Sequence, residues 1–412
     1  MGIEASKKRA SAAAVRPSKR PDASGTAATP LESAQRYETV ALVLQGGGAL
    51  GSYQCGVYEA LHASGIRPRW FAGTSIGAIN AAILAGNSAD VRIERLHEFW
   101  DTICKPAGAL AWPASAFAAM AGWLPRNASL NAWMNASSAL DAVMQGQQGF
   151  FAPRQLPPFA FADGSAAATS FYDTSALKTT LERLVDFDRI NSDGVRLSVG
   201  AANVATGNFR YFDSAHERIR PEHVMASGAL PPAFPAIEID GERYWDGGLV
   251  SNTPLEYLLE AEPRKDTLVL QVDLWSASGT LPKTIPDVLE RQKDIQFSSR
   301  TRLGTEVVAR RQRLRAALHA LLEKVPKRDV PAEMLEDLQP WMCDRVFNII
   351  HLIYRAKSYE EQYKDYAFGV ATMREHWRSG VDDMRRSLAH AEFFVPPSRH
   401  VGVVTHDIHR GR

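Results

Sequence analysis

A serine held between two glycines is the first feature of this sequence with the chemistry of a nucleophile. Ser75 lies in the run GTSIG, from Gly73 to Gly77, after a short apolar stretch and before an alanine-rich one. Between a strand and a helix, the spacing G-x-S-x-G makes a tight turn that exposes the serine oxygen, and small neighbours avoid clashes. The spacing predicts a nucleophile, with a tight turn that happens to contain serine as the alternative.

A serine hydroxyl needs a base before it can attack a carbonyl carbon. Eleven histidines are present, and none lies in an obvious motif. Asp246, in ERYWDGGLVSNTP, is the better candidate, because Gly247 and Gly248 allow close backbone approach. Partial burial would bring the pKa of this carboxylate close to what a base requires, and a simple Asp-Gly turn is the alternative.

A glycine-rich loop, GGGALG at residues 46–51, follows the apolar stretch ETVALVLQ. Its backbone N–H groups can surround an anion, and the helix after it adds positive partial charge. One candidate anion is a dinucleotide pyrophosphate, because Gly46, Gly48 and Gly51 satisfy G-x-G-x-x-G; the other is the oxyanion of an acyl transfer. The acidic residue that a nicotinamide site needs about twenty positions further on is missing from GIRPRWFAG.

These motifs need a sheet to position them. Residues 38–45 and 69–75 predict buried strands, and SYQCGVYEALHASG and IGAINAAILAG predict the helices that follow. Strand, glycine turn and helix, repeated, indicate a parallel sheet with helices on its faces. Further strands are expected at 196–204, 208–213 and 266–274.

Changes in composition divide the chain into segments. Residues 1–36 are rich in Ala, Ser, Pro and basic residues and bury too little surface to offset their ordering entropy, which predicts a disordered tail. We expect one α/β domain at 37–275 with a lid-like insertion at about 101–170, a helical extension at 276–395 and a second tail at 396–412.

Three stretches of the insertion and the extension carry particular expectations. The uncharged segment from Pro106 to Pro125 has nearly the length of a membrane span but contains Pro113, so it predicts a buried or interfacial cap. The apolar positions from Leu303 to Val325, interspersed with arginines, predict an amphipathic basic helix that either packs on the domain or lies on an anionic membrane. The stretch HLIYRAKSYEEQYKDYAFGVATMREHW, from His351, is expected to be helical.

Composition excludes several classes of protein. The 412 residues include 45% hydrophobic and 23% charged residues with a net charge of +1, which gives no reason to expect nucleic acid as a partner. Cys55, Cys104 and Cys343 show no metal or redox spacing and suit a reducing compartment. We expect a cytoplasmic protein without metal or cofactor, with peripheral membrane contact as an option.

Together, the glycine loop, the GTSIG run and the Asp-Gly-Gly run resemble the patatin-like phospholipase family from about Val40 to about Thr267. The stretch MASGALPPAFPAIEIDGERYWDGG adds a Ser-x-x-x-Pro pattern that is typical of this family. The resemblance implies a three-layer α/β/α sandwich with a mostly parallel central sheet. The C-terminal stretch is similar to a bacterial subgroup with a helical extension.

The resemblance also implies roles for individual residues. Ser75 would be the nucleophile and Asp246 its sole base, a Ser–Asp dyad. The oxyanion hole would be formed by Gly46, Gly47 and Gly48. The supporting motif glycines would be Gly51, Gly73, Gly77, Gly247 and Gly248.

The expected function is a serine acyl-ester hydrolase that acts on phospholipid or lysophospholipid through an acyl-enzyme. One departure bears on the substrate: Leu50 stands where many family members carry Arg or Lys. Arg67, Arg69 or an arginine of the lid would have to replace that charge. The alternative is an esterase for a non-phospholipid ester, such as a storage-polyester oligomer. A dinucleotide-binding oxidoreductase and a non-catalytic interaction protein are the remaining hypotheses.

Overall fold

The computed structural model describes residues 28–104, 128–192, 194–298, 301–326, 330–356 and 363–408. The expected cap from Pro106 to Pro125, and the expected tail up to residue 27, lie outside these described residues.

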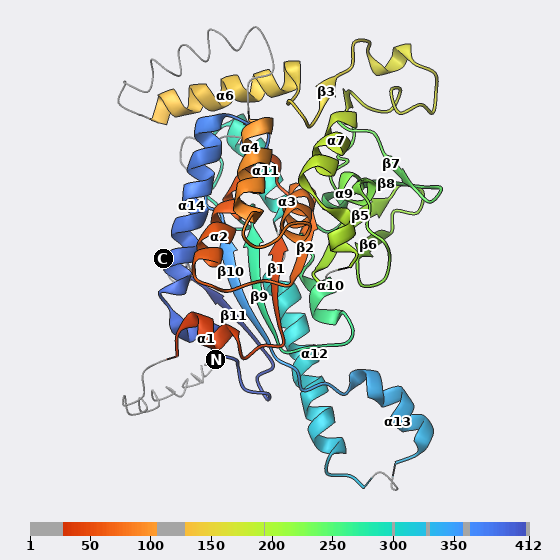
Figure 1. Ribbon diagram of the computed structural model, residues 1–412, viewed down its shortest axis with the longest axis vertical. Coiled ribbons are helices and arrows are strands. Elements are labelled where there is room, and N and C mark those ends of the chain that lie inside the picture. Colours follow the sequence, from red (N-terminus) through yellow and green to blue (C-terminus); the bar gives the residue numbers. More distant parts are fainter. Residues whose placement is uncertain are drawn as a thin grey trace, which may run out of the picture.

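A twisted, mostly parallel sheet forms the centre of the molecule (Figure 1). It has nine strands in the order β11-β10-β9-β1-β2-β5-β8-β7, with β6 paired to β5. The strands from β11 to β5 run parallel, and β6, β7 and β8 join antiparallel. Their bounds are β1 Thr39–Leu44, β2 Trp70–Thr74, β5 Arg196–Asn203, β6 Phe209–Asp213, β7 Ile237–Ile239, β8 Glu242–Asp246, β9 Thr267–Asp273, β10 Phe347–Ile353 and β11 Val403–Asp407. A separate pair, β3 Ala152–Pro153 and β4 Tyr172–Asp173, lies in the insertion.

Helices cover both faces of this sheet, which confirms the α/β sandwich. On one face, Leu42 and Leu44 of β1 join a large core with helices α2, α3, α4 and α14. The alternate residues Ala41 and Val43 point to the other face and join a smaller core with α10 and α12. Alternation along β1 thus separates the two layers of helices, as expected for a strand buried on both sides.

The helices have the following bounds: α1 Pro30–Ala34, α2 Ser52–Ala63, α3 Ile76–Ala85, α4 Arg92–Ile103, α6 Ala128–Gln145, α7 Ser175–Leu184, α8 Phe187–Ile190, α9 Pro221–Ser227, α10 Leu255–Glu260, α11 Ile285–Phe297, α12 Thr301–Leu322, α13 Ala332–Leu338 and α14 Val370–Leu388. Short 3₁₀ turns include η1 Gly48–Gly51 and η3 Gly247–Leu249. Every residue of α3 is buried, which explains its apolar, alanine-rich sequence.

The predicted strands and helices around the motifs are confirmed. The expected strands at 38–45, 69–75 and 266–274 correspond to β1, β2 and β9, and those at 196–204 and 208–213 to β5 and β6. The two helices expected after the glycine turns are α2 and α3.

The C-terminal third is largely helical, as expected, but it also contributes two strands to the sheet. The helical expectation is wrong for 351–353, which belong to β10, and the expected tail at 396–412 contains β11. The run FNIIHLI is buried between β9 and β11, and a fully buried strand has no polar alternation to distinguish it from a helix. The helix expected there begins only at Val370.

Two further expectations need correction. The ordered chain begins before residue 36, because Thr29 caps helix α1 in a capping box with Glu32. Helix α12 does not bury the predicted apolar stripe: Leu314 and Leu321 are exposed, whereas Val308 and Arg315 are buried. Arg315 is accommodated because its guanidinium pairs with Glu260 at 2.7 Å.

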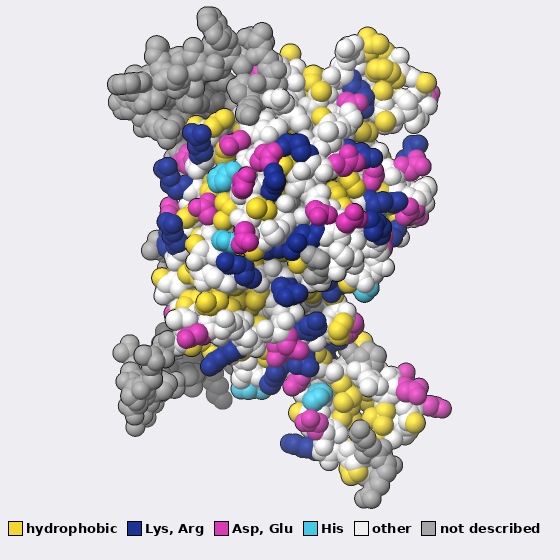
Figure 2. All heavy atoms as spheres, viewed as in Figure 1, with side chains coloured by type: hydrophobic (Ala, Val, Ile, Leu, Met, Phe, Trp, Pro, Cys, Tyr) yellow, Lys and Arg dark blue, Asp and Glu magenta, His cyan; other side chains and the backbone are white. Residues whose placement is uncertain are grey.

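Acidic and basic side chains are intermixed over the face drawn in Figure 2, without a large area of one sign. This agrees with the net charge of +1. Among the residues with described structure, no helix is long and apolar enough to cross a membrane.

Candidate active site

Ser75 lies at the sharp turn between β2 and α3. Its backbone has φ 57° and ψ −126°, a strained conformation for a residue with a side chain. A Cβ on Gly73 would lie 2.2 Å from the Gly77 carbonyl oxygen, and one on Gly77 would lie 2.3 Å from the Leu44 carbonyl oxygen. The two glycines are therefore required by the close approach of the chain on both sides of the serine.

The structure brings Ser75 and Asp246 together across 171 positions of sequence. The Ser75 hydroxyl donates a hydrogen bond of 2.6 Å to Oδ2 of Asp246. Asp246 ends strand β8, opposite Ala201 of β5, and its Oδ1 accepts from the Gly248 amide at 2.6 Å. Both carboxylate oxygens are therefore directed by the fold, one toward the serine and one toward the backbone.

The Asp246 carboxylate is buried, with 2% of the residue exposed. Burial raises its pKa to about 6, against the opposing hydrogen bonds from Ser75 and the Gly248 amide. A carboxylate with this pKa is mostly ionised at neutral pH and is a stronger base than an exposed one.

The glycine loop lies beside this pair, but its amides are not equivalent. The Gly46 amide donates to the Asn252 carbonyl at 3.3 Å, and the Ala49 amide donates to the Asp365 carbonyl at 2.7 Å. Within the described part of the chain, the Gly47 and Gly48 amides have no such partner. Two of the three expected oxyanion donors are therefore free, whereas Gly46 is already engaged.

The supporting glycines lie where other groups approach closely. A Cβ on Gly51 would lie 2.6 Å from Ile76, and one on Gly247 would lie 2.4 Å from the Gly200 carbonyl oxygen. Gly248 supplies the amide that holds Asp246.

A largely aromatic pocket of about 320 Å³ opens onto Ser75 and Asp246. Its walls come from the insertion, from the segment before β7 and from the C-terminal region: Phe150, Phe151, Tyr172, Phe234, Trp275, Phe297 and Phe368. Sequence analysis did not identify these residues, because single aromatic side chains carry no local pattern. Apart from Asp246 and Asp365, the described lining residues include no Asp or Glu, and they include no Lys, Arg or His.

The basic residues considered as substitutes for position 50 lie away from this pocket. Leu50 itself is fully buried in the core. Arg69 precedes β2, at the end of that strand opposite Ser75, and lines a second cavity of about 260 Å³. Arg67 donates to the His62 carbonyl, and Arg154 of the insertion pairs with Asp173.

Two residues that sequence analysis did not single out support the site. The Ser227 hydroxyl accepts from the Ser75 amide at 3.0 Å and donates to the Gly200 carbonyl at 2.6 Å. The Asn252 side-chain amide donates to the Gly46 carbonyl at 3.1 Å. The signal was available: Ser227 begins the Ser-x-x-x-Pro pattern, and Asn252 follows the Asp-Gly-Gly run in SNTP.

The Asp365 carbonyl lies over the loop, where a pyrophosphate would have to approach the same amides. Among the described residues, no group of three or more His, Cys, Asp or Glu is arranged to hold a metal ion.

The sheet with helices on both faces, and a serine at the tight turn after a parallel strand, define an α/β enzyme of the acyl hydrolase class. A model of the family described as patatin-like phospholipase matches residues 42–259, and a second, described as patatin phospholipase, matches residues 295–400. The first match covers more than half of the chain. The chain belongs to the patatin-like phospholipase family and is a lipid acyl hydrolase.

Among solved structures, the chain is similar to VipD from Legionella pneumophila. The two are 15% identical, with a TM-score of 0.36, over 86% of this chain and 67% of VipD. No curated protein matches the chain.

Proposed function

We propose that the protein hydrolyses acyl esters of lipids through a Ser75–Asp246 dyad. The observation that carries this proposal is the 2.6 Å hydrogen bond from the Ser75 hydroxyl to a buried carboxylate. No described His, Lys or Arg lines the pocket, so Asp246 is the base available to the serine.

In the first half-reaction, Asp246 takes the Ser75 proton while the serine oxygen attacks the ester carbonyl carbon. The carbonyl oxygen becomes negative, and the Gly47 and Gly48 amides donate to it. Each such donor stabilises the transition state by about 3 kcal/mol. The tetrahedral intermediate collapses, Asp246 returns the proton to the departing alcohol oxygen, and the acyl group remains on Ser75.

In the second half-reaction, water replaces the alcohol. Asp246 accepts a proton from that water as it attacks the acyl-enzyme, and the same amides stabilise the second oxyanion. Collapse releases a carboxylic acid and returns the proton to the serine oxygen.

We propose phospholipid or lysophospholipid as the substrate class, because the family is one of lipid acyl hydrolases and the aromatic pocket suits an acyl chain. A cytoplasmic location and peripheral contact with a bilayer are part of the proposal. The bilayer contact is supported by the exposed side chain of Val143, which lines the pocket, and by exposed Leu249 and Val250, which follow Gly248.

The second candidate is an ester without a phosphate, and a specific observation favours it. Among the described pocket residues there is no cation to pair with a phosphate. Comparing phospholipid vesicles with neutral soluble esters separates the two: a higher kcat/KM on vesicles favours phospholipid, and activity only on neutral esters favours the second candidate.

The dyad is tested with Ser75→Ala on a p-nitrophenyl ester. We expect kcat to fall about 10⁴-fold or more with an unchanged melting temperature, because the nucleophile is lost and the fold is not. Labelling by a fluorophosphonate probe should disappear in the same variant. Wild-type turnover by Ser75→Ala would exclude Ser75 as the nucleophile.

A further inference from the structure

Ala49, within the glycine loop, is held by the C-terminal region. The Ala49 amide donates to the Asp365 carbonyl at 2.7 Å, and the Ala49 carbonyl lies 3.4 Å from Nδ1 of His376 in α14. Gly48, with φ +55°, faces the same contact: a Cβ there would lie 2.0 Å from the Asp365 carbonyl oxygen. The position of Asp365 therefore bears directly on the free amides of Gly47 and Gly48.

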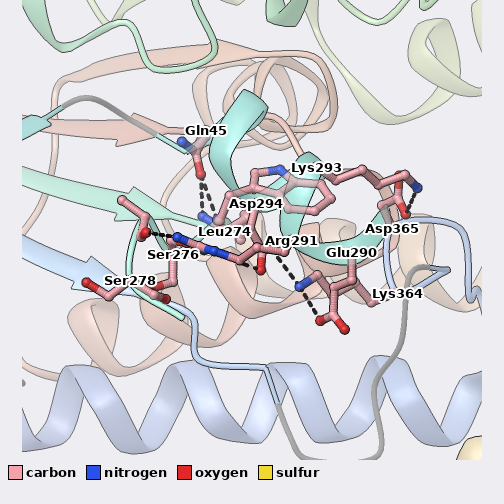
Figure 3. A network of polar contacts seen from close by, with 12 residues as sticks. Gln45, Leu274, Ser276, Ser278, Glu290, Arg291, Lys293, Asp294, Lys364 and Asp365 are labelled. Carbon is pink, nitrogen blue, oxygen red and sulfur yellow. Dashed lines mark hydrogen bonds and ion pairs between the residues drawn. The ribbon is translucent and has the colours of Figure 1, made fainter. Parts of the chain in front are cut away.

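Asp365 is in turn fixed to helix α11 by ion pairs (Figure 3). Lys293 of α11 contacts both carboxylate oxygens of Asp365, at 2.8 and 3.0 Å. The preceding residue, Lys364, contacts Glu290 at 2.9 Å and Asp294 at 2.8 Å. We call these five residues the charged cluster. Lys364 and Asp365 are adjacent in the chain and carry opposite charges. On α11, Glu290 and Asp294 pair with Lys364, and Lys293 pairs with Asp365. Only one register between the two segments makes all of these pairs.

Burial strengthens these contacts. The Lys364 side chain is only 4% exposed. Burial alone would lower its pKa, but the carboxylates of Asp294 and Glu290 outweigh that effect and raise it. An ammonium so enclosed retains its charge only with its partners in place.

Helix α11 has no fully buried residue, and Phe297 packs against the core only partly buried, so polar contacts hold much of the helix. At its C-terminus, the Phe297 carbonyl accepts from Gln45 at 3.1 Å and from Asn252 at 2.9 Å. Gln45 immediately precedes the glycine loop, and its side-chain oxygen accepts from the Leu274 amide at 2.6 Å. Helix α11 is thereby linked to the glycine loop in two places. Its Phe297 contacts Gln45, which precedes the loop, and its Lys293 contacts Asp365, whose carbonyl accepts from the Ala49 amide.

We propose that Asp365 is a positioning residue for the oxyanion amides, and that the charged cluster holds its backbone carbonyl against the Ala49 amide. The inference rests on the proposed function of the Ser75 site. It assigns a catalytic contribution to a part of the chain that carries neither nucleophile nor base.

The test uses Lys293→Met and, independently, Asp365→Asn in the full chain. Both break the same ion pair without removing the Asp365 backbone carbonyl or any apolar side chain of the pocket. With a soluble p-nitrophenyl ester, we expect kcat to fall roughly 10- to 100-fold, because small displacements of oxyanion donors are costly. KM, the melting temperature and the inflection of the pH–rate profile should stay near wild type, because the apolar walls of the pocket and Asp246 are unchanged and Asn has the same shape as Asp365 in the pocket lining.

Charge reversal supplies the rescue. Lys293→Glu combined with Asp365→Lys should recover most of the kcat that either single change loses. The matched control is Lys178→Met. This change breaks the 2.7 Å pair between Lys178 of α7 and Glu222 of α9, away from the charged cluster, and should leave kcat unchanged. Wild-type kcat in both Lys293→Met and Asp365→Asn would overturn the proposal. A fall in kcat that accompanies a lower melting temperature, and that the charge-reversal variant does not restore, would also overturn the proposal.

Ser75→Ala, run in the same assay, separates this inference from the proposed function. If Ser75→Ala keeps wild-type activity, the dyad is wrong. If Ser75→Ala is inactive but breaking the charged cluster changes nothing, only the positioning role of Asp365 is wrong.

Discussion

Two buried aspartates lie beside strand β5, and their chemistry is opposite. Asp213 of β6 pairs with Ser198, and Asp246 of β8 pairs with Ala201, on the same strand. Both are almost fully buried, at 1% and 2% exposed. The difference between them lies in their neighbours.

Asp213 is surrounded by donors and a cation. The Arg196 Nε donates to both carboxylate oxygens at 2.9 Å, and the hydroxyls of Ser198 and Tyr257 donate at 2.7 Å each. Burial alone would raise the pKa of Asp213, but the hydrogen bonds from Arg196 and Ser198 outweigh it and lower the pKa. Asp213 is an anchor that stays ionised.

Among the described residues, Asp246 accepts hydrogen bonds only from the Ser75 hydroxyl and the Gly248 amide, so burial dominates and raises its pKa to about 6. The comparison teaches that burial makes a base only where no cation accompanies it. The contrast leads to four predictions.

The largest effect is expected for Asp246→Asn. An amide cannot accept the Ser75 proton, so kcat on a soluble ester should fall about 10³- to 10⁴-fold. The matched change, Asp213→Asn, should leave kcat of the folded protein within about twofold. If Asp246→Asn retained wild-type kcat, a different base would be required.

The same variant should be more stable than the wild type. In the folded protein the pKa of Asp246 is about 6, whereas an unfolded Asp has about 3.9. Ionisation therefore destabilises the fold as the pH rises from 4 through 6, and Asp246→Asn removes that cost. Chemical denaturation at pH 8 should show a gain of up to about 3 kcal/mol, which disappears below pH 4.

The second effect concerns Arg196→Met, which leaves Asp213 buried without its cation. We expect the free energy of unfolding at pH 7 to fall by about 3 kcal/mol, while kcat of the folded protein is unchanged. Arg218→Met breaks an exposed pair with Asp188 and should cost less than about 1 kcal/mol. Equal losses of unfolding free energy in Arg196→Met and Arg218→Met would show that the buried Arg196–Asp213 pair stabilises the protein no more than an exposed pair does.

The smallest effect is the pH dependence of the wild-type enzyme. Only ionised Asp246 acts as a base, so kcat/KM should rise with pH, with an inflection near 6 and a plateau above about 7. At pH 5 it should be about a tenth of the plateau. Arg196→Met should keep the same inflection, because Asp213 does not take part; an inflection near pH 4 would contradict the raised pKa of Asp246.

Sequence analysis predicts those parts of the candidate site that short motifs encode. Ser75 with its glycines, the glycine loop and Asp246 each depend on a local turn, so each leaves a pattern in a few neighbouring residues. The contact of Asp365 with Ala49 and its pairing with Lys293 depend on segments far apart in the chain, and no local pattern reports them.

The same contrast between local patterns and contacts of distant segments decides which parts of the fold can be predicted from the sequence. The strands and helices from β1 to α3 were predicted because glycine turns separate them clearly. For strand β10, the sequence predicts a helix from His351 onward, because HLI is followed at once by charged and aromatic residues. Its assignment depends on pairing with β9, which lies about eighty positions earlier.

That pairing has a consequence for synthesis of the protein. Strand β9 has β1 on one side and β10 on the other, so its second neighbour does not exist until the ribosome has passed residue 353. Until then the nascent chain presents the bare edge of an apolar strand, a template for aggregation. Contacts over such long separations also slow folding, which prolongs the time during which this edge stays unpaired.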